Sequence, residues 1–181
     1  MKLEEKTLES KKIFKGRVID VDLDKIELPN GKISSREVVN HPGGVCIAAL
    51  TDKNELLFVK QYRYPYHKVI LELPAGKLEK DNSPLENGKR ELREETGAIG
   101  KDYISLGKLY PSPGYCGEII HLYACKIESF GDTDPDDDEF LDIIKIDINE
   151  AVKMVLENKI CDSKTQVAIL KLHALCQQSK F

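Results

Sequence analysis

The sequence predicts an α/β protein built as an α/β/α sandwich. Strand-like segments fill most of the chain, a capped helix interrupts them, and amphipathic helical segments end the chain. The chain has 181 residues with 41% hydrophobic content, which is enough for one compact domain with a sizeable core and hardly enough for two. Strands with helices on two sides are the arrangement that these segments favour.

Residues 1–40 alternate between apolar and polar side chains in the manner of strands. We expect strands at residues 13–19, 21–28 and 33–39, with Pro29, Asn30 and Gly31 as a strong hairpin turn. These residues leave two arrangements open. The strands form a small antiparallel sheet ahead of the main domain, or they are ordinary members of the core sheet.

The middle of the chain is more apolar. A break at residues 41–44 is followed by the almost wholly apolar segment 45–50, which suits a buried strand. Residues 55–62 form the next expected strand, and residues 70–73 are an apolar, strand-like run. Pro74, Ala75 and Gly76 then form a tight bend, which brings backbone carbonyls next to the helix that follows.

Local signals set both ends of that helix. Ser83 is a typical N-cap, Pro84 suits the first helical position, and Glu86 completes a capping box. The helix should run to Thr96, with Gly97 as its left-handed stop.

The helix carries three glutamates and an arginine within a turn and a half. Glu91 and Glu95 share one face, and Arg90 is paired with Glu94 at the i, i+4 spacing. Taken alone, such a helix is usually a solvated face. Next to the bend, however, carboxylates and a main-chain oxygen supply the hard oxygen ligands that Mg²⁺ or Mn²⁺ prefers.

The second half of the chain contains further strands and two helices. We expect strands at residues 103–110, 119–127 and 140–147 and amphipathic helices at 148–157 and 162–177. Lys164 and Thr165 fit a packing helix, and nothing there demands chemistry. The loop 111–118, with two prolines and two glycines, reads as a rigid surface loop, and the acidic segment 131–139 as a mobile solvated one.

Composition limits the classes of protein to which the chain can belong. No apolar run approaches membrane-spanning length and the N-terminus has no hydrophobic signal core, so we expect a soluble cytoplasmic protein without a membrane partner. The five cysteines have no C-x-x-C spacing, which favours buried reduced thiols. A net charge of -4 argues against nucleic acid as a partner.

Residues 76–98 resemble the Nudix box, G-x5-E-x7-R-E-U-x-E-E-x-G-U, in which U is an aliphatic residue. The chain departs from the box at Asn82, which stands where the family has its first glutamate, a residue of the helix start and scaffold. The substitution therefore bears on local stability and metal tuning more than on the fold. The matching positions are Gly76, Arg90, Glu91, Leu92, Glu94, Glu95 and Gly97, with Ala98 as a small final U.

The resemblance extends to a subfamily, the ADP-ribose pyrophosphatases. It implies a Nudix-type α/β/α sandwich with a mixed sheet over residues 43–181, preceded by a small antiparallel sheet over residues 1–42. In the subfamily that sheet builds a dimer, so we expect a homodimer. Arg36 and Glu37 match residues near the ligand in the subfamily, and Arg36 can pair with phosphate or stack on a base.

Other residues match the subfamily further along the chain. Arg63 resembles the arginine that holds the substrate phosphates, although without the family an arginine at a strand end is more often a solvated charge. Ser112, Pro113, Gly114 and Glu118 reproduce an S-P-G-x-x-x-E pattern, which places Pro113 and Glu118 at the substrate. Glu139 matches a glutamate that acts as catalytic base or completes the metal shell, with Asp138 as the alternative position.

The implied activity is metal-dependent hydrolysis of ADP-ribose to AMP and ribose 5-phosphate. Mg²⁺ is the expected cofactor, with Mn²⁺ as the alternative. The carbonyl of Ala75 and the carboxylates of Glu91 and Glu95 are the expected ligands, and Arg90 holds the carboxylates in place. Glu94 or Glu139 orients the attacking water.

Three other functions stay open at this point. The first is the same kind of hydrolysis with another nucleoside diphosphate sugar or a dinucleotide as the substrate. The second is a binding module that senses ADP-ribose or another nucleotide without cleaving it. The third is a house-cleaning enzyme for oxidised nucleoside triphosphates, which fits the box but neither the N-terminal sheet nor the loop 111–118. The intact R-E-L-R-E-E argues against the binding module.

Overall fold

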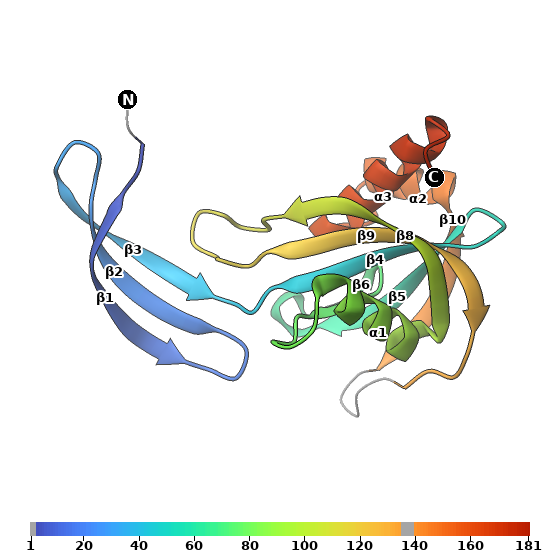
Figure 1. The fold of residues 1–181 in the computed structure, drawn as a ribbon, viewed down its shortest axis with the longest axis horizontal. Coiled ribbons are helices and arrows are strands. Elements are labelled where there is room, and N and C mark those ends of the chain that lie inside the picture. Colours follow the sequence, from blue (N-terminus) through green and yellow to red (C-terminus); the bar gives the residue numbers. More distant parts are fainter. Residues whose placement is uncertain (1–2, 135–139) are drawn as a thin grey trace. The chain divides into compact units, whose positions relative to one another are not determined.

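The structure is a computed structural model and describes residues 3–134 and 140–181 (Figure 1). The chain divides into two compact units. The first unit is Met1–Gly43 with Tyr110–Ile119, and the second unit is Gly44–Leu109 with Ile120–Phe181. The division expected between residues 42 and 43 stays a prediction.

The first unit contains a sheet of its own, which decides between the two arrangements that the sequence left open. Its strands are β1 (Lys6–Lys15), β2 (Asp20–Glu27) and β3 (Ile33–Asn40), paired antiparallel in the order β1-β2-β3. The turn before β3 closes through a hydrogen bond from the Leu28 N–H to the Lys32 carbonyl, with Gly31 at a φ of 80°. The small antiparallel sheet is thus confirmed.

The prediction of a strand at residues 13–19 was wrong in its bounds. The strand β1 begins at Lys6 and ends at Lys15, and residues 16–19 make a turn in which the Gly16 N–H donates to the Ile19 carbonyl (2.9 Å). Two register shifts interrupt the pairing of β1 with β2, and every residue of β1 is exposed. Bulges and a polar surface remove the alternation by which a strand is found in a sequence.

The second unit is built on a seven-stranded sheet with the strand order β10-β5-β4-β9-β8, in which β6 pairs with β5 and β7 with β4. The pair β4 and β9 is parallel and the other pairs are antiparallel, so the sheet is mixed, as predicted. The strands are β4 (Gly44–Leu50), β5 (Glu55–Arg63), β6 (Lys68–Glu72), β7 (Ala75–Lys77), β8 (Ala98–Leu109), β9 (Ile120–Phe130) and β10 (Leu141–Asp147).

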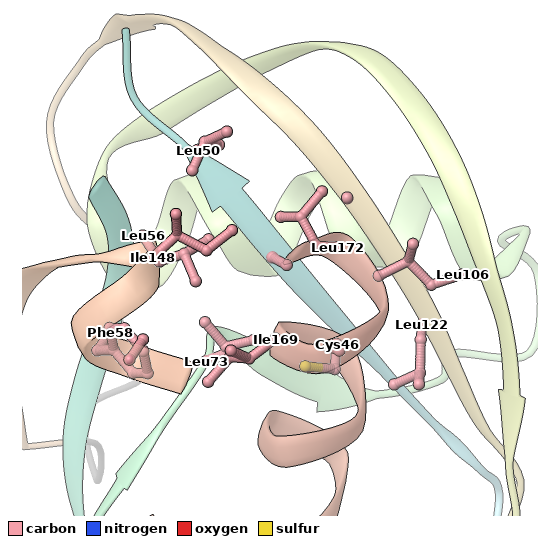
Figure 2. Packing of buried hydrophobic residues seen from close by; sticks show 14 of the residues in the cluster. Cys46, Leu50, Leu56, Phe58, Leu73, Leu106, Leu122, Ile148, Ile169 and Leu172 are labelled. Atoms are coloured by element: carbon pink, nitrogen blue, oxygen red, sulfur yellow. The ribbon is translucent and has the colours of Figure 1, made fainter. Parts of the chain in front are cut away.

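Helices cover both faces of this sheet, as the alternation along β4 shows. Cys46, Ala48 and Leu50 belong to a buried cluster that includes residues of α2 (Ile148–Leu156) and α3 (Ser163–Gln177), and Figure 2 shows part of that cluster. Val45, Ile47 and Ala49 belong to a second cluster with Leu92 of α1 (Pro84–Thr96). Successive side chains of a strand point to opposite faces, so β4 anchors both layers of an α/β/α sandwich.

The helix α1 has the ends that the sequence predicted. The Glu86 N–H donates to Ser83 Oγ (3.2 Å), and Gly97 follows the helix at a φ of 69°. The helix lies close to β4, because a Cβ added to Gly88 would come 2.6 Å from Ile47 Cδ1. The part of the chain that the structure describes has no helix long and apolar enough to cross a membrane.

Candidate active site

The site begins where α1 crosses the short strand β7. The sequence predicted a tight bend at residues 74–76, but Ala75 and Gly76 lie in β7, paired with Cys46 and Val45 of β4. A Cβ added to Gly76 would come 2.0 Å from Glu91 Cδ and 2.1 Å from its Oε1. Glycine is therefore required here to let the Glu91 carboxylate lie against the strand backbone.

Glu95, one turn after Glu91 on α1, contacts the same strand. Its Oε2 accepts a hydrogen bond from the Ala75 N–H (3.0 Å), and the residue is only 4% exposed. Ala75, Gly76, Glu91 and Glu95, which the sequence grouped as a site, thus lie together in the second unit. Two carboxylates and the backbone of β7 form this group, which we call the box site.

Arg90 links the glutamates of the helix. Its Nη2 lies 2.6 Å from Glu91 Oε1 and its Nη1 2.5 Å from Glu94 Oε2, while Glu79 Oε1 is 3.5 Å from Nη2. Burial by itself would lower the pKa of Arg90, but the neighbouring carboxylates outweigh it and raise that pKa. Arg90 thus holds a fixed positive charge between two carboxylates.

Asn82 takes part in a polar network around the start of the helix. Its Nδ2 donates to Glu79 Oε2 (3.2 Å), the same carboxylate that approaches Arg90. Buried Asn87 accepts from the Glu79 N–H (3.1 Å) and donates to the carbonyls of Ser83 and Asn82. Glu79 therefore lies between Asn82 and Arg90, and Asn87 fixes the loop that carries it.

Arg63, predicted to bind phosphate, is held by a buried carboxylate. Its Nε and Nη2 donate to the two oxygens of Glu72 at 2.6 and 2.7 Å, while 38% of its side chain stays exposed. Lys164 also binds Glu72, so the expectation that it only packs was incomplete. The sequence carried one signal for this network, a glutamate within the otherwise apolar run 70–73.

The remaining predicted residues belong to the first unit, apart from one. Arg36 on β3 forms a bidentate pair with Glu5, with Nε to Oε2 at 3.0 Å, and Glu37 is exposed. Pro113 and Glu118 lie in the loop that follows β8, where His41 Nδ1 is 3.4 Å from Glu118 Oε1. Glu139 lies outside the described residues.

The loop 110–119 is tied to the sheet of the first unit. The Val39 N–H donates to the Tyr115 carbonyl (2.8 Å), and the Gly117 N–H donates to the Val39 carbonyl (2.9 Å). These bonds extend the end of β3 and place Glu118 next to it. The S-P-G-x-x-x-E segment thus has a defined backbone partner.

The box site fits a divalent cation by the chemistry of its donors. Two carboxylates and a backbone carbonyl are the hard oxygen ligands that Mg²⁺ and Mn²⁺ take. Within residues 3–134 and 140–181, no group of three or more His, Cys, Asp or Glu side chains is arranged to hold a metal ion. The expected ligand set has only two such side chains, and its third member is the carbonyl of Ala75.

The motif and the fold agree with matches to known proteins. Residues 40–164 match the NUDIX domain, and this segment is more than half of the chain. The chain belongs to the Nudix family. Residues 5–39 match the Nucleoside diphosphate sugar hydrolase N-terminal domain.

Relatives of this Nudix protein are known over nearly its whole length. An ADP-ribose pyrophosphatase from Bacillus subtilis (strain 168) is 41% identical over 182 residues, covering 98% of each chain. A methanol dehydrogenase activator from Bacillus methanolicus is 45% identical over 168 residues, covering 92% of this chain and 91% of the relative. An ADP-ribose pyrophosphatase from Mycobacterium tuberculosis (strain ATCC 25618 / H37Rv) is 32% identical over 172 residues, covering 93% of this chain and 83% of the relative.

The fold matches a solved structure as well. A crystal structure of an ADP compounds hydrolase has a TM-score of 0.87 with 19% identity, covering 100% of both chains. The predicted resemblance to the ADP-ribose pyrophosphatases of the Nudix family is confirmed by these matches.

Proposed function

We propose that this Nudix pyrophosphohydrolase cleaves ADP-ribose with water to give AMP and ribose 5-phosphate. The observation that carries the proposal is the box site, in which Glu91 and Glu95 lie against Gly76 and Ala75 of β7. The ADP-ribose pyrophosphatases among the relatives support the choice of substrate. In this reaction the oxygen of water bonds to one phosphorus as the bond from that phosphorus to the bridging oxygen breaks.

Mg²⁺ is the proposed cofactor, with Mn²⁺ as the alternative. The Ala75 carbonyl, Glu91 and Glu95 would hold it, and bound metal would neutralise the phosphates and make a water molecule more acidic. Without a bound cation, the negative charges of the two carboxylates would repel the anionic substrate. Arg90 is bound to Glu91 and Glu94 and orients the carboxylates of these two residues.

The remaining groups bind the substrate and move a proton. Arg63 attracts the phosphates, since a guanidinium offers paired donors to phosphate oxygens. Glu94 or Glu139 takes the proton of the attacking water. Arg36, Glu37, Pro113 and Glu118 are the other residues proposed to bind the substrate.

We propose a homodimer that forms through the sheet of the first unit. That sheet exposes large apolar side chains, among them Ile13 (55%), Phe14 (53%) and Ile33 (55%). Exposed apolar surface of this kind is typical of protein interfaces. Light scattering after gel filtration should give twice the mass of the chain, and Phe14→Glu should shift it toward one chain; a wild-type protein with the mass of one chain contradicts the dimer.

The experiment that tests the function is AMP release from ADP-ribose with Mg²⁺, with and without EDTA. NADH, GDP-mannose, a diadenosine polyphosphate and 8-oxo-dGTP run beside it as competing substrates. We expect metal-dependent AMP formation with ADP-ribose preferred. A preference for another compound contradicts the proposal that ADP-ribose is the substrate. Tight binding of ADP-ribose with no turnover of any compound contradicts the proposal that the chain is an enzyme.

A second candidate function rests on the methanol dehydrogenase activator, which is 45% identical to this chain. We propose that the chain also raises the activity of a methanol dehydrogenase. The test is methanol oxidation by the purified dehydrogenase with and without this chain, with heat-denatured chain as control. An unchanged rate contradicts this second function and leaves the first untouched.

A further inference from the structure

Glu72, at the end of β6, is a buried carboxylate outside the box motif. It is 2% exposed, and both of its oxygens accept from the guanidinium of Arg63. A bidentate pair fixes the plane of a guanidinium as well as its position. Because Nε and Nη2 are the atoms bound to Glu72, the opposite edge of Arg63 is the one that can turn to a phosphate.

The same carboxylate is bound from a distant part of the sequence. Lys164, the second residue of α3, donates to Glu72 Oε2, and its Nζ also lies 3.0 Å from Asp162 Oδ1. Lys164 is only 9% exposed, so its charge is compensated within the protein. Arg63, Glu72, Lys164 and Asp162 thus form a continuous chain of ion pairs, which we call the buried network.

A second contact between α3 and this segment lies directly beside the first. The hydroxyl of Thr165, fully buried, accepts a hydrogen bond from the Leu73 N–H (2.9 Å). Two residues later, the Ala75 N–H donates to Glu95 of α1. The segment from Glu72 to Ala75 is therefore held by α3 at one end and by α1 at the other.

Electrostatics indicates that Glu72 is ionised within this network. Burial would raise the pKa of Glu72, but the hydrogen bond from Arg63 and the charges of Lys164 and Arg63 outweigh it and lower that pKa. If Arg63 were the only cation bound to Glu72, its positive charge alone would balance the negative charge of this carboxylate. Lys164 shares that negative charge, which leaves Arg63 with more of its attraction for an anion.

We propose that Glu72 and Lys164 are positioning residues, which act through Arg63 to hold its guanidinium toward the substrate phosphates. The inference rests on the proposed function, because it needs an anionic substrate at Arg63. Neither residue belongs to the Nudix box. The helix α3 is thereby more than a packing layer, since its first turn orients a substrate-binding arginine.

The test is a double-mutant cycle on ADP-ribose hydrolysis with Arg63→Ala, Glu72→Gln and the double variant. Glu72→Gln should lower kcat/KM by roughly 10-fold to 100-fold, mainly through a higher KM, which is the size of effect known for residues that orient metal ligands. In the Arg63→Ala background the same change should alter kcat/KM less than about 3-fold, because the residue through which Glu72 acts is gone.

Controls separate orientation from damage to the fold. Glu150→Gln removes an exposed glutamate that is 3.6 Å from Lys153 on α2, and it should leave kcat/KM unchanged. Far-UV circular dichroism and a thermal melt accompany every variant. If Glu72→Gln fails to fold, Glu72→Asp keeps the charge but withdraws the carboxylate by one methylene, and the same cycle is run with it.

The outcomes distinguish failure of the positioning role from failure of the proposed function. Equal losses from the Glu72 variant in both backgrounds, or no loss in either, overturn the positioning role and leave the proposed function standing. A folded wild-type protein that releases no AMP overturns the proposed function and with it the positioning role. A loss that disappears in the Arg63→Ala background supports both.

Discussion

Gly76 is the residue on which the geometry of the box site depends most directly. A Cβ at this position would lie 2.0 Å from Glu91 Cδ, closer than any real contact. Gly131, which also belongs to the second unit, has no atom within 4 Å of an added Cβ. The two positions form a matched pair for the same substitution.

Gly76→Ala should lower kcat for ADP-ribose on the order of 100-fold, since a displacement of about 1 Å in a catalytic group can have that effect. The methyl group would push Glu91 away from β7. Steady-state kinetics of both variants checks this, with Gly131→Ala expected to behave as wild type. Equal activity of the two glycine variants would show that Glu91 does not act where the structure places it.

Asn87 shows what single-residue sequence reasoning missed. It is fully buried and serves as acceptor for Glu79 and donor to Ser83 and Asn82. In the sequence it is one polar residue on a charged helix, and nothing in its type or spacing separates it from a solvated side chain. Its role follows from a loop that folds back over the helix.

Asn87→Asp should lower the free energy of unfolding by about 1–3 kcal/mol, because two backbone carbonyls would then face a carboxylate in place of their donor. Urea unfolding at neutral pH measures it. Asn149→Asp on α2, an exposed position, is the control and should stay within about 0.5 kcal/mol of wild type. A buried variant as stable as the control would contradict the assigned hydrogen bonds.

Helices and strands were predicted correctly where the residues that set their ends act locally in the sequence. The bounds of α1 were predicted because Ser83, Pro84 and Gly97 act on the ends of the helix next to them in the sequence. The three-residue strand β7 was missed because only its pairing with β4 makes it a strand. The early start of β1 was missed for the same reason, since its polar residues gain their conformation from β2.

The helix α3 is joined to the β6–β7 segment by a hydrogen bond that a single substitution can remove. Thr165→Val keeps the shape of the side chain but leaves the buried Leu73 N–H without its acceptor. We expect a loss of about 1–3 kcal/mol of unfolding free energy. Thr165→Ser retains the hydroxyl and should lose less; chemical denaturation that ranks serine below valine would contradict this contact.

For the whole molecule, the buried network should make stability depend on pH in the acid range. The folded pKa of Glu72 lies below its ordinary value of 4.5, so the unfolded chain takes up a proton first as the pH falls. The stabilisation is complete above that ordinary value and is lost as the pH falls through the lower, folded pKa. Glu72→Gln lacks this contribution.

The difference in unfolding free energy between wild type and Glu72→Gln should therefore shrink as the pH is lowered from 7 toward 3. Urea unfolding at a series of pH values gives this difference directly. Wild type should be the more stable protein at neutral pH. A difference that stays constant over the whole range would show that Glu72 is not held ionised by Arg63 and Lys164.

The order of strand-like and helical segments predicted the fold class, and one motif predicted the family, because Gly76 and the glutamates of α1 must occur at fixed spacing to meet across β7. The sequence could not predict the network of Glu72 and Lys164, whose members are 92 residues apart and meet only when α3 packs on the sheet. Local chemistry can be read from spacing, whereas contacts between distant segments depend on packing.

The proposed hydrolysis of ADP-ribose depends on the carboxylates of the box site. The most direct measurement is the rate of AMP formation by wild type, Glu91→Gln and Glu95→Gln with saturating Mg²⁺, alongside circular dichroism. Both variants should stay folded and lose turnover by a factor on the order of 10³ or more, because a neutral amide is a far poorer metal ligand. Near-wild-type rates in both folded variants would contradict a catalytic role for the box site.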